Sequence, residues 1–196
     1  MFIDFLSLLL VNMGAGLVLL AWYVFQGLDD TDQRKWAPGF GIVGLVATVF
    51  GGYVVTHWPL PGPYNSIFGE MSVLFGVAFL GAAWALAQGW SLVPVAAYAF
   101  FAGGMAVVNG VCIAHLGLTK NPGLAAVGFI LTGLGGLLAC PTLLYLRSHR
   151  AFRTAAALIL VAAAAIWLLT AGMAYWMHPA MWLKWTPTVY QSVPKM

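Results

Sequence analysis

Three histidines and one glutamate are the residues in this sequence whose types and spacing favour metal chemistry. His57, His115 and His178 each end a long hydrophobic segment, and Glu70 is the one acid inside such a segment. If alternate segments end on the same side of a membrane, all four side chains lie at one end of the protein. Imidazoles with a carboxylate can enclose a tetrahedral metal ion, and two histidines can bind haem iron axially. We therefore predict a metal or haem site formed by these four residues.

The residue types leave the identity of the bound group open between copper, zinc, iron and haem b. Three methionines recur at helical spacing around His178: Met173, Met177 and Met181. Thioethers together with imidazole favour copper over zinc. Tyr64 and Asn65, in the loop next to Glu70, are expected to donate hydrogen bonds that orient the ligands.

Ordinary structural roles account for the same residues. Histidine is amphipathic and common where a membrane meets water, so each histidine could simply be an interfacial residue. Glu70 follows Asn65 and Ser66 in the first turn of a predicted helix, where a carboxylate interacts favourably with the helix dipole. Asp4 is expected to begin a helix in the same way, rather than to bind a metal.

The composition indicates an integral membrane protein. Among 196 residues, 62% are hydrophobic and only 7% are charged, whereas a soluble domain has about 25% charged residues. The surface must therefore face the lipid bilayer. The net charge of +3 comes from basic residues concentrated in short loops, which argues against nucleic acid as a partner.

Four long stretches without formal charge predict about six transmembrane helices, because one crossing takes about 20 apolar residues. Prolines and glycines separate the segments. Short loops make successive helices antiparallel, so we predict one all-α domain over residues 1–196, built as three consecutive helical hairpins with an outward tail at 178–196. The predicted helices are 5–25, 38–58, 67–87, 93–115, 123–146 and 154–177.

Basic residues predict the orientation. One set of loops carries five of them and the opposite side three: Arg34, Lys35, Arg147, Arg150 and Arg153 against Lys120, Lys184 and Lys195. Cytoplasmic loops are enriched in lysine and arginine. We therefore expect a multi-pass protein of the prokaryotic cytoplasmic (inner) membrane, with both termini and the predicted histidine site facing outward.

Two segments on the outward side resemble a known family. They are Pro63-Tyr-Asn-Ser-Ile-Phe-Gly-Glu70 and Gly117-Leu-Thr-Lys-Asn-Pro122, the second followed by Ala125-Ala126. Over most of the chain, from the second to the fifth predicted helix, the sequence resembles the predicted integral membrane protein family catalogued as domain of unknown function 981. The resemblance implies a small prokaryotic multi-helix membrane protein. It implies no activity.

Three functions are compatible with these observations. The first is a membrane protein that binds a transition metal or haem at its outward face, as part of a redox system. The second is an accessory subunit without its own cofactor, packed on other membrane-protein subunits or on copies of itself. The sequence has no catalytic triad, spaced cysteine pair or zinc-protease motif, and whether the protein is an enzyme stays open.

The third function, a small transporter, ranks last of the three. An ion or proton pathway normally has an ionisable residue near the midplane of the membrane. The main polar residues at that depth are uncharged: Asn12, Asn109 and Thr132. We expect Asn109 and Thr132 to form interhelical hydrogen bonds rather than to line a conduction path.

Overall fold

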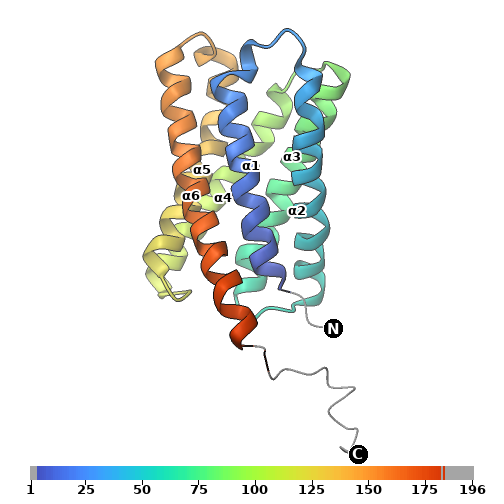
Figure 1. The fold of residues 1–196 in the computed structure, drawn as a ribbon. Helices are drawn as coiled ribbons and strands as arrows, with labels where there is room; N and C mark the ends of the chain where they lie inside the picture. Colours follow the sequence, from blue (N-terminus) through green and yellow to red (C-terminus); the bar gives the residue numbers. More distant parts are fainter. Residues whose placement is uncertain (1–3, 182, 184–196) are drawn as a thin grey trace, which may run out of the picture.

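The computed structural model describes residues 4–181 and 183 and consists of six long helices joined by short loops (Figure 1). All six helices are long and apolar enough to cross a membrane, so the predicted all-α membrane bundle is confirmed. The described residues form no strand. The helices are α1 Phe5–Phe25, α2 Ala37–His57, α3 Met71–Gln88, α4 Val93–Leu116, α5 Pro122–Pro141 and α6 Arg150–Met181.

Local sequence signals explain most of the helix ends. The carboxylate of Asp4 accepts a hydrogen bond from the Ser7 amide at 3.2 Å and caps α1, which is the helix-start role expected for Asp4. The side chain of Asn121 caps α5 in the same way, just before Pro122. Gly117 ends α4 in the left-handed region, with φ of 64°.

Irregular turns and the last helix differ from the predicted bounds. A π-helical turn, Asn65–Glu70, precedes α3, and a second one, Thr142–Leu146, continues α5. Helix α6 begins earlier than predicted, at Arg150, and runs past Pro179 to Met181. Pro179 lies in the last turn of α6, so the backbone hydrogen bond that proline cannot donate is one of the last in the helix. Of the predicted outward tail, residues 182 and 184–196 lie outside the described part.

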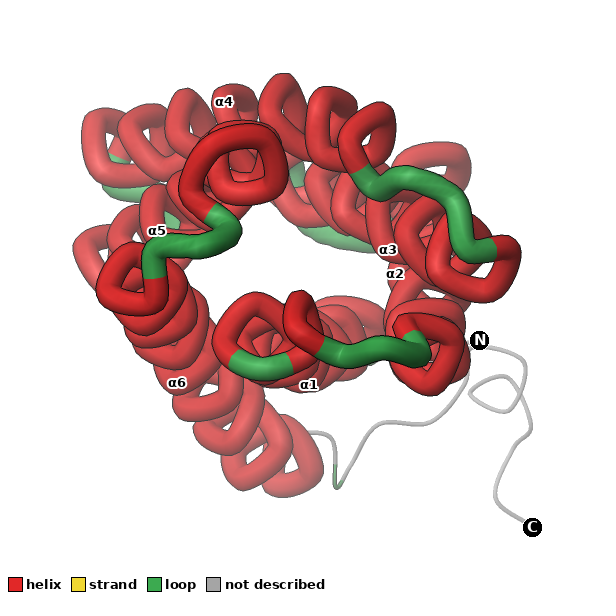
Figure 2. Tube along the Cα trace, turned by 90° about the horizontal axis from the view of Figure 1, so that it is seen from above, coloured by secondary structure: helices red, strands yellow, loops and turns green. Residues whose placement is uncertain are grey.

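The six helices form a closed ring in sequence order, in which each helix packs against its two neighbours and α6 packs against α1 (Figure 2). Successive helices are antiparallel, as predicted. The most extensive contacts, however, join α2 to α3, α4 to α5, and α6 to α1. The tightly packed pairs are therefore shifted by one helix from the predicted hairpins.

Glycines explain why these pairs are tight. A Cβ atom added to Gly103 of α4 would lie 2.5 Å from the carbonyl oxygen of Gly133 on α5. A Cβ atom added to Gly76 of α3 would lie 2.6 Å from the backbone nitrogen of Thr48 on α2. Backbones approach this closely only where small residues face each other, as is common between helices in membranes.

The ring has two chemically different ends. Helix α1 begins and α6 ends at the lower end in Figure 1, which we call the histidine end because it carries His57, His115 and His178. The opposite end, the arginine end, carries Asp29 and Arg153. Between the two ends, large apolar side chains are exposed on the outer surface, where they contact the lipid bilayer.

Candidate functional site

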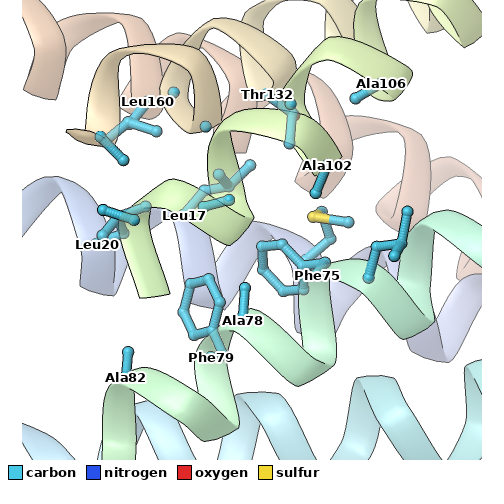
Figure 3. Close-up of a pocket in the computed structure, with 18 of the residues that line it drawn as sticks. Leu17, Leu20, Phe75, Ala78, Phe79, Ala82, Ala102, Ala106, Thr132 and Leu160 are labelled. Carbon is cyan, nitrogen blue, oxygen red and sulfur yellow. The ribbon is translucent and has the colours of Figure 1, made fainter. Parts of the chain in front are cut away.

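A cavity of about 200 Å³ lies inside the ring (Figure 3). Its wall extends from Leu6 near the histidine end to Leu92 near the arginine end. Every helix contributes to this wall; examples in order from α1 to α6 are Leu17, Phe40, Phe75, Ala106, Thr132 and Leu160. None of the described residues that line the cavity is charged. This arrangement is an axial, uncharged compartment inside a membrane protein.

Aromatic side chains line both halves of the cavity. Toward the arginine end, the rings of Phe40 and Phe79 stack with their centroids 5.1 Å apart, and the ring centroids of Phe75 and Phe79 are 4.3 Å apart. Toward the histidine end, Phe129 contacts Trp167 edge-on at 5.2 Å. Large rigid rings therefore border the cavity in both of its halves.

A polar pair crosses from α5 to α6 at the cavity wall. The indole Nε1 of Trp167 donates a hydrogen bond to Thr132 Oγ1 at 2.9 Å, and Thr132 Oγ1 donates to the Gly128 carbonyl at 2.8 Å. The interhelical hydrogen bond predicted for Thr132 is thus present. Thr132 also lines the cavity, a position that the sequence did not lead us to expect.

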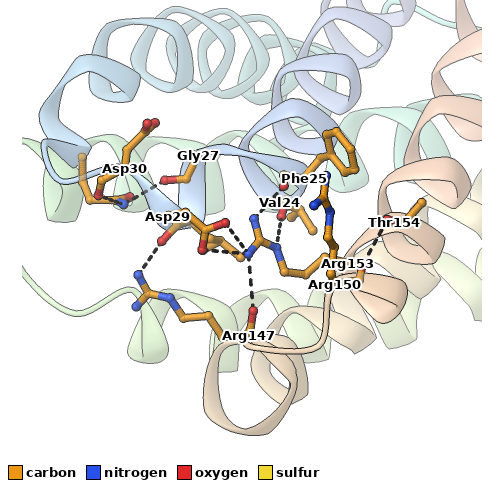
Figure 4. A network of polar contacts seen from close by, with 11 residues as sticks. Val24, Phe25, Gly27, Asp29, Asp30, Arg147, Arg150, Arg153 and Thr154 are labelled. Carbon is orange, nitrogen blue, oxygen red and sulfur yellow. Dashed lines mark hydrogen bonds and ion pairs between the residues drawn. The ribbon is translucent and has the colours of Figure 1, made fainter.

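At the arginine end, Arg153 connects the start of α6 to the end of α1 (Figure 4). Its guanidinium donates to the carbonyls of Val24 at 2.8 Å and Phe25 at 2.6 Å, and it pairs with Asp29 at 2.7 Å. Arg153 is buried, whereas the Asp29 side chain is 70% exposed. The last carbonyls of a helix have no partner within the helix, so Arg153 supplies the donors that α1 lacks.

At the histidine end, Asp4 and His178 form a second contact between α1 and α6. Asp4 Oδ2 lies 2.6 Å from His178 Nδ1, and Ser7 Oγ lies 3.4 Å from the same nitrogen. Burial alone would raise the pKa of Asp4, but the hydrogen bonds from Ser7 and His178 outweigh burial and hold it below its usual value. The carboxylate is therefore charged at neutral pH.

The structure does not bring the other predicted metal ligands to His178. His57 is exposed and stacks on Tyr53 at 4.1 Å, while His115 and Glu70 are exposed on α4 and on the turn before α3. The physical reason is the ring itself, since α2, α4 and α6 are alternate helices whose ends lie apart around its rim (Figure 2). In the described part of the chain, no three His, Cys, Asp or Glu residues are grouped so that they could hold a metal ion.

Tyr64 and Asn65 make hydrogen bonds that order loops at the histidine end. The fully buried Asn65 accepts from the Leu60 amide at 2.8 Å and donates to the Gly62 carbonyl at 2.9 Å. The Tyr64 hydroxyl accepts from the Thr119 amide at 3.1 Å and so links the loop before α3 to the loop after α4. Both side chains therefore have structural partners of their own.

A regular spacing in the sequence marks the cavity wall, although it did not enter the predictions above. On α3 the lining residues include Phe75, Ala78, Phe79 and Ala82, and on α4 Ala99, Ala102, Gly103 and Ala106. Both sets recur at intervals of three and four residues, which places them on one helix face. Of these residues, those on the α3 face alternate between aromatic and small and those on the α4 face are all small, which leaves room for the cavity beside them.

The model of the family described as protein of unknown function (DUF981) matches residues 1–181, and the chain belongs to this family. The resemblance inferred from the two outward segments is therefore confirmed. A comparison with curated proteins finds no match.

Two solved structures share the fold. The closed-state structure of the Helicobacter pylori urea channel superposes with a TM-score of 0.70 at 19% identity, covering 88% of this chain and 98% of that one. A crystal structure of the urea channel from the same human gastric pathogen gives a TM-score of 0.67 at 21% identity, with the same coverage. These TM-scores and coverages show that the chain shares its fold with both structures.

The prediction of a metal-binding or haem-binding redox protein is wrong, whether with copper or with another metal. Its four proposed ligands are dispersed around one end of the ring, and the described residues contain no group of three or more His, Cys, Asp or Glu residues that could hold a metal ion. Solved structures of the same fold are channels rather than oxidoreductases. The transporter alternative, ranked last from the sequence, agrees better with both findings.

Proposed function

We propose that this protein conducts small uncharged molecules across the membrane through the axial cavity of its helix ring. The observation that carries the proposal is the closed ring of six membrane-length helices around a cavity to which every helix contributes. The likeness in fold to urea channels supports the same function.

The chemistry of the wall supports uncharged solutes rather than ions. An ion inside an apolar wall loses its hydration shell without gaining compensating partners, at a cost of several kcal/mol or more. No charged residue among the described ones lines the cavity to offset this loss. The absence of mid-membrane charge, which argues against an ion pathway, is compatible with a pathway for neutral molecules.

Stopped-flow light scattering on proteoliposomes tests the proposal with urea, glycerol, acetamide and 1,2-propanediol. At least one solute should cross faster than in protein-free vesicles, while potassium flux stays at background. Ala102→Phe, which adds a ring inside the cavity, should lower the solute flux to background. Ala165→Phe, on the exposed face of α6, is the matched control and should leave it unchanged. If no solute exceeds the protein-free rate with correctly folded protein, the proposal fails.

We further propose that the arginine end faces the cytoplasm of a prokaryotic cell and the histidine end faces outward. The excess of basic residues at the arginine end supports this orientation. In a variant without Cys112 and Cys140, a single cysteine at Gly123 should react with a membrane-impermeant thiol reagent in intact cells, and one at Ser148 should not. The reverse labelling would invert the orientation.

Self-association is a separate proposal. Gly52, Gly104 and Gly172 lie on α2, α4 and α6, and a Cβ atom at each would meet nothing within 4 Å. Small residues on a lipid-facing helix surface permit close approach of a second helix. Photobleaching-step counts of labelled protein in bilayers should therefore exceed one per particle. A count of one at all protein densities would leave the chain a monomer.

A further inference from the structure

We infer, on the basis of the proposed function, that the cavity is dry and admits solutes with few hydrogen-bonding groups in preference to urea. Only five polar residues line the cavity among the described ones: Tyr23, Ser72, Thr132, Thr142 and Trp167.

Two of these polar residues already donate their hydroxyl protons to acceptors within the protein. The Tyr23 hydroxyl donates to Gln33 Oε1 at 2.7 Å, at the arginine end. The Thr142 hydroxyl donates to the Leu138 carbonyl one turn earlier at 2.6 Å. Neither hydroxyl therefore has a proton to offer a solute without breaking a bond within the protein.

Two more residues satisfy each other. Trp167 has a single donor, and that donor is bonded to Thr132 Oγ1 at 2.9 Å. The Thr132 proton is in turn directed to the Gly128 carbonyl at 2.8 Å. The pair offers a solute no donor and at most one remaining acceptor lone pair.

Ser72 is the exception. Its side chain is almost fully buried and lines the cavity, and among the described residues no hydrogen bond joins its hydroxyl to the protein. It lies at the contact between α3 and α2, because a Cβ atom on Gly51 would come within 2.8 Å of Ser72 Cβ. The wall thus supplies one uncommitted hydroxyl along its whole length.

The size and lining of the cavity predict that it stays free of water. An engineered cavity of about 150 Å³ lined by leucine, isoleucine and phenylalanine stays dry and binds benzene or xenon. The present cavity of about 200 Å³ has a similar lining. A water molecule or solute needs two to four polar partners to replace those it leaves in solution, and the Ser72 hydroxyl is the one uncommitted side-chain donor among the described residues of this wall.

Urea is poorly matched to such a wall. It carries four N–H donors and a carbonyl, and each polar group buried without a partner makes entry less favourable. Acetamide has nearly the same shape, with a methyl group in place of one amino group. The pathway should therefore favour acetamide over urea, and weakly hydrogen-bonding neutral molecules in general.

The test compares the two amides in proteoliposomes of the full chain, each after subtraction of the rate in protein-free vesicles. The protein-mediated permeability for acetamide should exceed that for urea by at least about tenfold, which corresponds to about 1.4 kcal/mol. The double variant Ala102→Ser and Ala106→Ser adds hydroxyls to the wall and should reduce this ratio roughly threefold or more. Ala165→Ser, on the outer face of α6, should leave the ratio unchanged.

The outcomes separate the inference from the proposed function. A urea permeability equal to or above that of acetamide would overturn the inference and leave the conduction pathway intact. A tenfold ratio that the added hydroxyls do not change would also overturn it, because the wall would not be the source of selectivity. If neither amide crosses faster than in protein-free vesicles, both the inference and the proposed function fail.

Discussion

Replacing Gly103 by alanine should destabilise the protein, whereas the same change at the adjacent Gly104 should not. A Cβ atom at Gly103 would lie 2.5 Å from the Gly133 carbonyl oxygen and 2.8 Å from the Leu137 backbone nitrogen. Both are backbone atoms of α5, so the clash is relieved only by moving the helices apart. A Cβ atom at Gly104 would meet nothing within 4 Å.

Comparing the two adjacent variants isolates the free-energy cost of packing α4 against α5. Alanine is favoured over glycine inside a helix by about 1 kcal/mol, and this gain applies to both variants and cancels between them. Their difference in unfolding free energy is then the cost of overpacking α4 against α5, typically about 1–3 kcal/mol. We expect the upper part of that range, because the contacting atoms cannot rotate away.

Reversible unfolding in mixed detergent micelles, followed by tryptophan fluorescence, measures this difference. Gly104→Ala should match or slightly exceed the wild-type stability, and Gly103→Ala should fall below it by about 2 kcal/mol. Because Gly103 also lines the cavity, its variant should conduct solutes less well even where it folds. Equal stabilities for the two variants would refute the close contact between α4 and α5.

Three further predictions concern the ends of the ring. Arg153→Met should lower the unfolding free energy by about 3 kcal/mol, because two charge-assisted hydrogen bonds to α1 carbonyls are lost. Asp29→Asn should lower it by less than about 1 kcal/mol, because that carboxylate is 70% exposed. Similar losses for the two variants in thermal unfolding would contradict the role of Arg153 as the donor to the end of α1. Wild type should be more stable than Asp4→Asn by a constant free energy above the ordinary aspartate pKa of 3.8, and this advantage should disappear as the pH falls through the lower pKa of Asp4 in the folded protein. The reason is that a depressed pKa stabilises the fold only while the carboxyl group is ionised. Melting curves from pH 7 to pH 3 test this, and an advantage that grows on acidification would contradict the depressed pKa. Asn65→Leu should lower the unfolding free energy by roughly 3 kcal/mol and expose the preceding loop to proteolysis, because the Leu60 amide and the Gly62 carbonyl lose their hydrogen-bond partner. An unchanged digestion pattern would contradict this prediction.

The sequence predicted the helices well because charge and proline are local signals. Charge-free runs located all six membrane-length segments, and Pro122 correctly marked the start of α5. Such signals do not predict the order of the helices around the ring. Nearly every face of each helix is apolar, so no amphipathic stripe indicates which helix packs against which. The π-helical turns at residues 65–70 and 142–146 also lack a local signature, because they reflect how neighbouring segments meet.

The candidate site was mispredicted for a related reason. His57, His115 and His178 lie at the same end of the ring, and topology alone could place them there. Whether they converge depends on lateral position, and alternate helices of a six-membered ring keep their ends apart. The contact that does form, between His178 and Asp4, joins α6 to α1, which are the two helices farthest apart in the sequence.

The low rank given to transport rested on the absence of ionisable residues at mid-membrane depth. That criterion is sound for ions and protons, which need charged or strongly polar partners inside the bilayer. It does not apply to neutral solutes, for which an uncharged wall excludes ions without a dedicated filter. Phe75, Ala102 and Leu160 line the cavity, and none of these side chains carries a polar group that would distinguish it in the sequence. A ring of apolar helices can thus enclose a cavity that the sequence marks by the spacing of small and aromatic residues on the faces that meet at its axis.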